Sequence, residues 1–223
     1  MPSSDVVEEA SPASKTLSDW RRCIIWSLGV GLAALLLAGV FHRPLLRGVA
    51  RLWHVDQTAG SADAIVVSTG ASPEQFEQAL SWWREGRAPR LVLTRSETKP
   101  TDRAGITVSM VEQRRQQLDA AGVPDAARVF IGEELRLLSQ ELPVVRGWAG
   151  SNGVKRILVP AEPFATRRVN WLARRVLSPA GMDATVVAVT TPHYSVTEWW
   201  RTKEGLLAME NEWALMAYYW WNH

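Results

Sequence analysis

The chain has 223 residues, with 25 basic and 23 acidic side chains and a formal net charge of +2. Charge so close to balance is not typical of a nucleic-acid-binding protein, and we expect no nucleic-acid partner. The single cysteine, Cys23, excludes a disulfide framework and a thiolate metal cluster.

An uncharged run of nineteen residues extends from Cys23 to Phe41. Because a helix rises about 1.5 Å per residue, roughly twenty apolar residues cross the ~30 Å hydrocarbon layer of a bilayer. His42, Arg43 and Pro44 follow the run directly, where a signal peptide would have a small-residue cleavage site. The sequence therefore predicts a transmembrane anchor over residues 22–42. A cleaved signal peptide and a buried core helix are the alternatives.

Flanking charge leaves the orientation of this anchor open. Three basic residues precede the run and three follow it: Lys15, Arg21, Arg22, Arg43, Arg47 and Arg51. Positive residues mark the cytoplasmic flank, so the two sides are equivalent. We expect residues 1–21 to form a disordered head, residues 43–61 an amphipathic juxtamembrane connector, and residues 62–223 one α/β domain.

After residue 62, short apolar runs alternate with helical patterns. The expected strands are residues 64–67, 91–93, 129–131, 157–159 and 185–189. The expected helices begin at Pro73 and end before Gly86, then cover about 108–121, 136–151 and 164–177. Such an alternation is typical of parallel strands buried on both faces. The sequence predicts a doubly wound, mainly parallel Rossmann-like sheet of about five strands, preceded by one transmembrane helix.

The last helix is expected to be capped by Ser195 or Thr197 and to run nearly to His223. Apolar residues recur along it at helical spacing: Trp199, Leu206, Met209, Trp213, Met216 and Trp220. A stripe of this kind usually covers a core. The end of the helix, residues 218–221, has instead the composition of an interfacial aromatic belt.

Candidate site residues follow from the predicted sheet, because ligands bind outside the carboxyl ends of parallel strands. Those ends carry Ser68, Thr69, Gly70, Arg95, Glu134, Glu162, Arg167 and His193. Arginine beside a helix N-terminus suits a phosphate or carboxylate ligand. These residues also have ordinary structural interpretations. Residues 68–70 could be a tight turn, Glu134 a solvated carboxylate in a first helical turn, and His193 a loop residue without a catalytic role.

Known catalytic and cofactor fingerprints are missing from the sequence. It contains neither a Walker A loop nor G-x-G-x-x-G, and neither G-x-S-x-G nor H-E-x-x-H. The histidines are far apart in sequence, which makes a histidine-rich metal site unexpected. We therefore expect no cofactor and no metal.

Several segments together resemble one family of bacterial proteins. They are ADAIVVSTG (62–70), ALSWWREGRAPRLVLT (79–94), LDAAGVP (118–124), VKRILVPAEPFATRR (154–168) and the closing helix (198–221). Over most of residues 50–221 the chain resembles the SanA/YdcF/ElyC-type envelope proteins. The resemblance implies a Rossmann-like sheet and an anchor in the bacterial inner (cytoplasmic) membrane, with the head cytoplasmic and the domain periplasmic. It also implies a role in peptidoglycan or surface-polymer metabolism, without defining a reaction.

The chain departs from that family pattern at three places. The glycine run expected after the first strand is reduced to Gly70, and the histidine expected three residues before Arg167 is Phe164. A Ser/Thr-rich stretch after the third strand is represented only by Ser139 with Glu141. If the missing imidazole were catalytic, His193 would have to replace it.

These observations predict a membrane-anchored protein of cell-envelope biogenesis. It would bind or act on an anionic, phosphate-bearing glycan or lipid-linked wall precursor, as a hydrolase or transferase if it is an enzyme. Glu134, Glu162 and His193 are the candidate catalytic residues, and Ser68, Thr69, Gly70, Arg95, Ser139 and Arg167 the candidate substrate-binding residues. The alternatives are a catalytically degenerate family member that is a scaffold for a membrane partner, with its last helix as the contact, and a cytoplasmic nucleotide binder.

Overall fold

The computed structural model describes residues 13–55 and 57–222, and the chain divides into two compact units, residues 1–46 and 47–223. Helix α1 (Ala13–Trp53) belongs to the first unit up to residue 46. Residues 13–21 of the expected disordered head are part of this helix, whereas residues 1–12 lie outside the described part. In the described ranges, no helix combines the length and the apolar character that crossing a bilayer requires.

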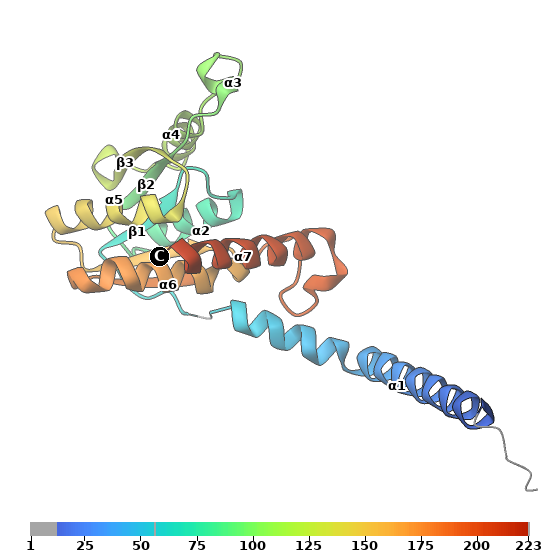
Figure 1. The fold of residues 1–223 in the computed structure, drawn as a ribbon. Helices are drawn as coiled ribbons and strands as arrows, with labels where there is room; N and C mark the ends of the chain where they lie inside the picture. Colours follow the sequence, from blue (N-terminus) through green and yellow to red (C-terminus); the bar gives the residue numbers. More distant parts are fainter. Residues whose placement is uncertain (1–12, 56, 223) are drawn as a thin grey trace, which may run out of the picture. The chain divides into compact units, whose positions relative to one another are not determined.

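The second unit is built on one parallel sheet (Figure 1). Its strands are β1 (Ala64–Ser68), β2 (Leu91–Ser96), β3 (Arg128–Leu135), β4 (Arg156–Ala161) and β5 (Asp183–Ala188). They lie in the order β3-β2-β1-β4-β5, and all four neighbouring pairs are parallel. The predicted α/β fold with a five-stranded, Rossmann-like parallel sheet is confirmed.

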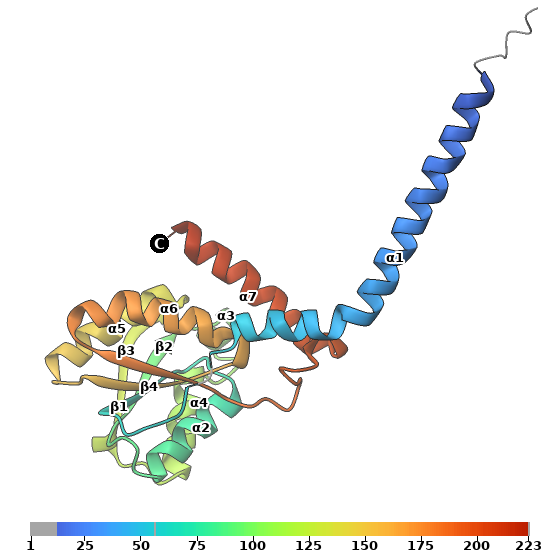
Figure 2. The ribbon, with the colours of Figure 1, turned by 90° about the horizontal axis from the view of Figure 1, so that it is seen from below.

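Helices connect the strands and cover both faces of the sheet (Figure 2). The helices that follow β1 in the chain are α2 (Pro73–Arg84), α3 (Pro100–Arg103), α4 (Met110–Ala120), α5 (Leu138–Ser151), α6 (Thr166–Leu177) and α7 (Lys203–Asn222). Single 3-10 turns lie at Asp125–Ala127, Pro163–Ala165, Ser178–Ala180 and Trp199–Arg201. As predicted, the first of the covering helices, α2, ends just before Gly86, whose φ of 71° is the left-handed conformation that favours glycine after a helix.

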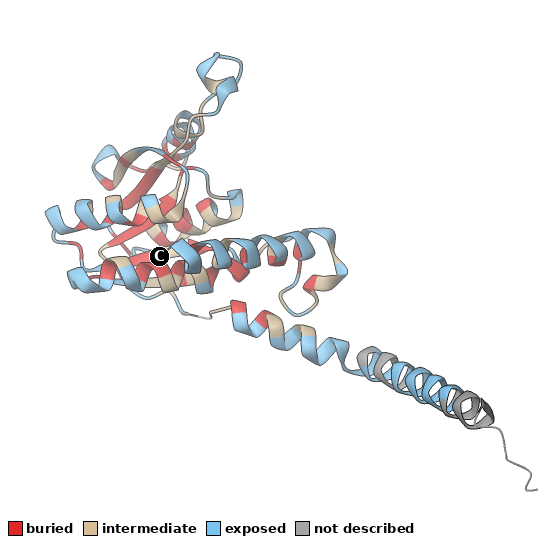
Figure 3. Ribbon diagram, in the orientation of Figure 1, coloured by how far each residue is buried: buried red, intermediate tan, exposed pale blue. Residues whose placement is uncertain are grey.

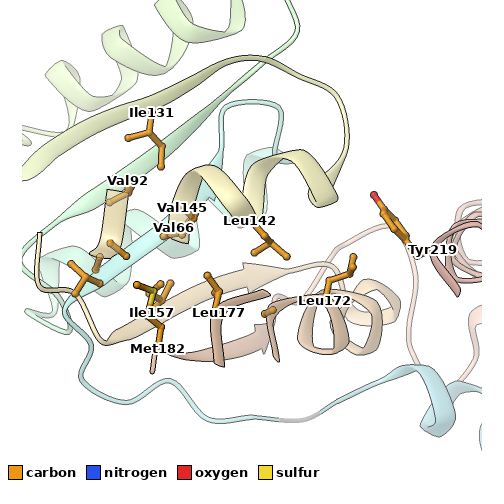
Figure 4. Packing of buried hydrophobic residues seen from close by; sticks show 14 residues of the cluster. Val66, Val92, Ile131, Leu142, Val145, Ile157, Leu172, Leu177, Met182 and Tyr219 are labelled. Atoms are coloured by element: carbon orange, nitrogen blue, oxygen red, sulfur yellow. The ribbon is translucent and has the colours of Figure 1, made fainter. Parts of the chain in front are cut away.

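Alternation along each strand divides the core into two layers. Val66 of β1 faces a cluster that includes residues of α5, α6 and α7, whereas Ile65 and Val67 face a cluster with α2 and α4. Buried positions therefore concentrate in the strands and on the inner sides of the helices (Figure 3). Figure 4 shows the first of these clusters, in which Tyr219 of α7 is 1% exposed. Helix α7 is thus part of the fold on the α6 side of the sheet.

The start of α7 differs from the prediction. The helix begins at Lys203, and the Thr202 hydroxyl accepts the Gly205 N–H at 3.1 Å. Ser195 and Thr197, the expected caps, instead hydrogen-bond to each other at 2.9 Å in the preceding loop. A 3-10 turn intervenes because the chain first packs Trp199 against the core, which a side-chain cap signal does not reveal.

The buried face of α7 also differs from the predicted stripe. Met209 is buried, but Leu206, Trp213 and Trp220 are 48%, 56% and 79% exposed. The face toward the sheet is instead formed by Gly205, Met209, Glu212 and Tyr219. The helix is rotated so that a carboxylate and a phenol point inward, and three large apolar side chains of the predicted stripe point outward.

The end of α1 belongs to the second unit and packs on it. Ala50 and Trp53 are buried, and the Trp53 ring lies 5.4 Å from the ring of Trp213 in α7. The Thr166 hydroxyl at the start of α6 accepts the Val55 N–H at 2.8 Å. The connector is therefore helical to Trp53, as its apolar spacing predicted, and its end is held by α6 and α7.

Candidate functional site

A cavity lies where the order of the strands reverses. From β1 the chain continues to β2 on one side, whereas β4 lies on the other side of β1. The connections that leave the carboxyl ends of β1 and β4 therefore run in opposite directions, which makes the space between these two ends the switch point of the sheet. A cavity of about 410 Å³ is open at this position. Its polar lining comes from every layer of the fold: Ser68, Gln75, Ser96, Arg136, Glu141, Glu162, Arg168, Asn211 and Glu212. The volume is within the range of about 300–1,000 Å³ that small-molecule sites occupy.

The loop after β1 is held rigidly at the edge of this cavity. The Thr69 side chain is fully buried, and its Oγ1 accepts the Ser96 N–H at 2.8 Å. Arg114 of α4, 4% exposed, donates to the carbonyl oxygens of Thr69 and Ala71. Because of these bonds, Gly70 forms part of the cavity wall, whereas the Thr69 side chain is buried and does not line the cavity.

The N-terminus of α2 is already occupied by side chains of its own. Gln75 accepts the Ser72 N–H at 2.9 Å, and Ser72 accepts the Gln75 N–H at 3.3 Å, which forms a capping box. The carboxylate of Glu74 accepts hydrogen bonds from its own backbone N–H and from the Ser72 hydroxyl, which lowers its pKa. A phosphate at this helix end, as in many dinucleotide sites, would compete with these groups.

Glu141, in the first turn of α5, is a carboxyl group of the cavity whose pKa is shifted by burial. Burial raises its pKa, although hydrogen bonds donated by Thr94 and Ser68 act in the opposite direction. The Thr94 bond is 2.7 Å long, and Thr94 is fully buried. A carboxyl group with a raised pKa keeps its proton to a higher pH than an ordinary glutamate does and can donate it to a ligand.

Glu162, immediately after β4, is the second such group. Although the residue as a whole is exposed, loss of water around its carboxyl raises its pKa, and the hydrogen bond from Tyr194 opposes the rise. That bond is 3.1 Å long. The Tyr194 ring stacks on Phe164 at 5.2 Å, so the phenylalanine at the position of the expected histidine supports the partner of Glu162.

A buried ion pair closes the cavity on the side of α6 and α7. Arg168 donates from Nε and from Nη2 to the two carboxylate oxygens of Glu212, both at 2.7 Å. The side chains are 12% and 4% exposed. Because the Glu212 carboxylate already neutralises the guanidinium, the main role of Arg168 is to hold α7 against α6, and it attracts an anionic ligand only weakly.

Three of the nine residues predicted for the site line the cavity, namely Ser68, Gly70 and Glu162. His193 lines an adjoining hollow of about 180 Å³ that Glu162 shares, and its Nε2 lies 3.8 Å from the Glu74 carboxylate. Glu162 therefore lines both the cavity and the adjoining hollow. A ligand that extends from the cavity into the hollow would contact His193.

Glu134 and Arg95 lie at the β2–β3 end of the sheet edge and do not line the cavity in the described part of the chain. Glu134 accepts hydrogen bonds from Thr98, at 2.7 Å to the hydroxyl, and from Arg103 at 2.9 Å, which lower its pKa. Arg95 pairs with Glu133 at 3.4 Å. A carboxylate held ionised in this way is poorly suited to proton transfer near neutral pH.

Ser139 and Arg167 also lie outside the lining of the cavity among the residues described. Their neighbours Glu141 and Arg168 line it instead. The orientation of each helix on the sheet, which is set by its buried apolar side chains, decides which residue of such a pair points inward.

Glu141, Arg168 and Glu212 were not among the predicted site residues. For Glu212 the sequence does contain a signal, because Met209, Glu212, Met216 and Tyr219 recur at spacings of 3, 4 and 3. An acid on such a face must be buried and needs a cationic partner. The signal that Glu141 belongs to the site is weaker. It is only that Glu141 lies in the first turn of the helix after β3, near the carboxyl end of that strand.

No set of three or more histidine, cysteine, aspartate or glutamate side chains is arranged to hold a metal ion within the described ranges. The polar groups that line the cavity are hydroxyl, amide, carboxyl and guanidinium groups. Together they can hydrogen-bond a ligand rich in hydroxyl groups and exchange protons with it.

No family model and no curated protein sequence matches the chain. Among solved structures, the chain is similar to a universal stress protein in complex with cAMP, with a TM-score of 0.37 and 14% sequence identity. The similarity covers 59% of this chain and 98% of that protein.

Proposed function

We propose that the protein is a membrane-attached component of bacterial cell-envelope biogenesis whose cavity binds the glycan part of an anionic, lipid-linked precursor. The observation that carries this proposal is the presence of two carboxyl groups with raised pKa, Glu141 and Glu162, in one cavity at the switch point of the sheet. Titratable groups perturbed in this way concentrate at functional sites.

The proposed ligand chemistry follows from the lining. Gln75 and Asn211 present amides, Ser68 and Ser96 present hydroxyls, and the two glutamates present carboxyl groups. Sugar hydroxyls both donate and accept hydrogen bonds, so a glycan satisfies such a mixed set. A ligand that carried only negative charge would meet several carboxyl groups here.

An anionic part of the ligand has a separate place. A neighbouring hollow of about 390 Å³ shares Gly70, Ser96 and Arg136 with the cavity and adds Lys99. Lys99 and Arg136 are exposed, and Arg136 pairs with Glu97. A phosphate group that exchanges for the Glu97 carboxylate would lie here while the glycan occupies the cavity.

If the protein is an enzyme, Glu141 and Glu162 are its acid/base pair. Glu141 holds a proton at a pH where an ordinary glutamate has lost it, and donates that proton to a leaving oxygen. Glu162 is oriented by Tyr194 at the mouth of the cavity and accepts a proton from the attacking hydroxyl or water. Hydrolysis or transfer at a phosphate or glycosidic bond is the reaction class that this pair serves.

Attachment to the inner membrane through the uncharged run Cys23–Phe41 is part of the proposal, with the second unit on the periplasmic side. Described side chains of the run are widely exposed, among them Trp26, Leu28 and Val40 at 75%, 68% and 70%. Large apolar side chains that are exposed along a helix favour burial in an apolar environment. For an uncharged run of this length, a bilayer is the favoured environment.

A scaffold without catalysis is the second candidate, and the charge pairing at the sheet edge favours it. Both arginines of the cavity already have carboxylate partners, Glu97 for Arg136 and Glu212 for Arg168. A binding subunit needs no free catalytic cation. In cells, a scaffold would keep its function in Glu141→Gln and Glu162→Gln variants, whereas an enzyme would not.

The test uses the full chain in lipid nanodiscs with three ligands: a polyprenyl-diphosphate-linked disaccharide, the free disaccharide, and polyprenyl phosphate. We expect tightest binding of the linked disaccharide and weaker binding of the free sugar, with mass spectrometry reporting any turnover. Binding of polyprenyl phosphate alone, with no gain from the sugar, would contradict a glycan site. Failure of all three to bind would remove the proposed substrate class.

A further inference from the structure

The outward flank of α7 is an exposed apolar surface. Leu206, Trp213 and Trp220 are seven residues apart, so they lie on the same side of the helix, and all three are at least 48% exposed. Trp221 adds a side chain that is 88% exposed. We call these four residues the α7 flank. Single exposed apolar residues are common, but three tryptophans and a leucine exposed together on one helix favour a partner.

The C-terminal half of α7 is free of acidic and basic side chains. From Trp213 to Asn222 the sequence is WALMAYYWWN, without aspartate, glutamate, lysine, arginine or histidine. The one acid of this helix that faces inward, Glu212, is paired with Arg168. This half of the helix can therefore leave water without desolvating a charge.

The residue types distinguish a bilayer from a protein partner. Each exposed indole has an N–H that needs an acceptor, and a dry protein interface would have to provide one for every ring. The headgroup layer of a membrane offers phosphate and carbonyl oxygens everywhere, which is why tryptophan and tyrosine concentrate there.

The surroundings of the flank agree with a membrane. Trp213 contacts Trp53 at the end of α1, and only residues 42–52 separate Trp53 from the uncharged run Cys23–Phe41. Exposed Arg47 and Arg51 lie on that connecting stretch, where anionic headgroups attract basic side chains.

We propose that the α7 flank lies in the headgroup layer of a bilayer that contains anionic lipids. This rests on the proposed membrane attachment and adds a second contact to it. Because Asn211 and Glu212 of the same helix line the cavity, docking of α7 holds the cavity at the membrane surface. A ligand whose lipid tail stays in the bilayer can then reach it.

The experiment uses the full chain in vesicles of phosphatidylethanolamine and phosphatidylglycerol, labelled with a polarity-sensitive fluorophore at one cysteine. The natural Cys23, which is exposed, reports on the uncharged run. In a Cys23→Ser background, Trp221→Cys reports on the α7 flank, and Ala126→Cys, exposed at the opposite end of the strands, is the matched control. Lipids with a quencher near the headgroup measure depth.

We expect a blue shift and a loss of emission by quenching for the label at residue 221, and neither for the label at residue 126. Emission of the 221 label unchanged by vesicles while Cys23 is quenched would overturn the docking of α7 and leave membrane attachment intact. A quenched 221 label with Cys23 in water would support docking and contradict the anchor. A blue shift at 221 without vesicles that grows with protein concentration would indicate a second copy on the flank and overturn the proposal.

Discussion

Arg168 of α6 and Glu212 of α7 form a two-point ion pair in the wall of the cavity, with both N–H···O distances at 2.7 Å. The pair joins the last helix of the chain to the sheet domain at the place where the ligand is proposed to bind. The Arg168 guanidinium also lies 5.7 Å from the ring centre of Tyr219, which is buried two turns later in α7.

Removal of one member of this pair should be costly. Glu212→Ala leaves a buried guanidinium without its partner, and we expect the free energy of unfolding to fall by about 3–5 kcal/mol. Urea denaturation of the full chain in detergent measures this change. Glu198→Ala is the matched control, since Glu198 pairs with Arg201 at 3.3 Å on the surface and should contribute about 0–1 kcal/mol. An equal decrease in the free energy of unfolding of the two variants would show that the buried pair contributes no more to stability than a surface pair.

The raised pKa of Glu141 makes stability depend on pH. Between its ordinary pKa of 4.5 and its raised folded pKa, the folded state binds more protons than the unfolded state, so this group lowers stability as pH rises. Glu141→Gln removes that loss. We therefore expect the stability of the variant, relative to the parent, to increase as pH rises from the ordinary pKa of 4.5 to the raised pKa of Glu141 in the folded state.

A second change at the same contact checks the assignment to Glu141. Thr94→Val removes the 2.7 Å hydrogen bond that lowers the pKa of Glu141, so the pKa should rise further and the dependence of stability on pH should extend to higher pH. Urea midpoints across the pH range measure both variants. A constant difference between Glu141→Gln and the parent would mean that this carboxyl is not desolvated.

Tyr194→Phe should shift the titration of Glu162. The phenol donates to the carboxylate and lowers its pKa, so its removal raises that pKa and moves the titration midpoint upward. Carbon NMR of labelled glutamate side chains detects the shift directly. The stacking of residue 194 on Phe164 should survive, because only the hydroxyl is lost. An unchanged Glu162 midpoint would show that the hydrogen bond is not formed in solution.

The start of α7 depends on a glycine. A Cβ added at Gly205 would lie 2.2 Å from the Trp199 carbonyl oxygen, so Gly205→Ala must displace the preceding 3-10 turn. We expect a loss of at least about 1–3 kcal/mol. Gly147→Ala in α5 is the control, because a Cβ there meets no atom within 4 Å. A helix-interior glycine-to-alanine change in open space should increase stability by about 0.5–1 kcal/mol, as measured by thermal unfolding.

Much of the fold could be predicted because the signals are local. The apolar runs identify five strands, and Pro73 marks the start of α2 before any tertiary contact is considered. The start of α7 could not be predicted from Ser195 or Thr197, since burial of Trp199 determines where the chain turns. Tertiary packing therefore overrides a cap signal there.

The site could be predicted in part for the same reason. Ser68, Gly70 and Glu162 follow strands, so their place at the sheet edge follows from the topology alone. Glu141 and Arg168 are on helices, and their inward orientation depends on which apolar face of α5 and α6 packs on the sheet. One position along a helix turns a side chain by about 100°, enough to replace Arg167 with Arg168.

The most direct test of the account compares three single variants in binding of the lipid-linked disaccharide to the full chain in nanodiscs. Glu141→Gln and Glu162→Gln should each weaken binding about tenfold or more, equivalent to about 1.4 kcal/mol, and abolish any turnover. Glu134→Gln, outside the cavity, should leave affinity within about twofold of the parent. Loss of binding in Glu134→Gln with parental affinity in the other two would contradict the assignment of the cavity as the site.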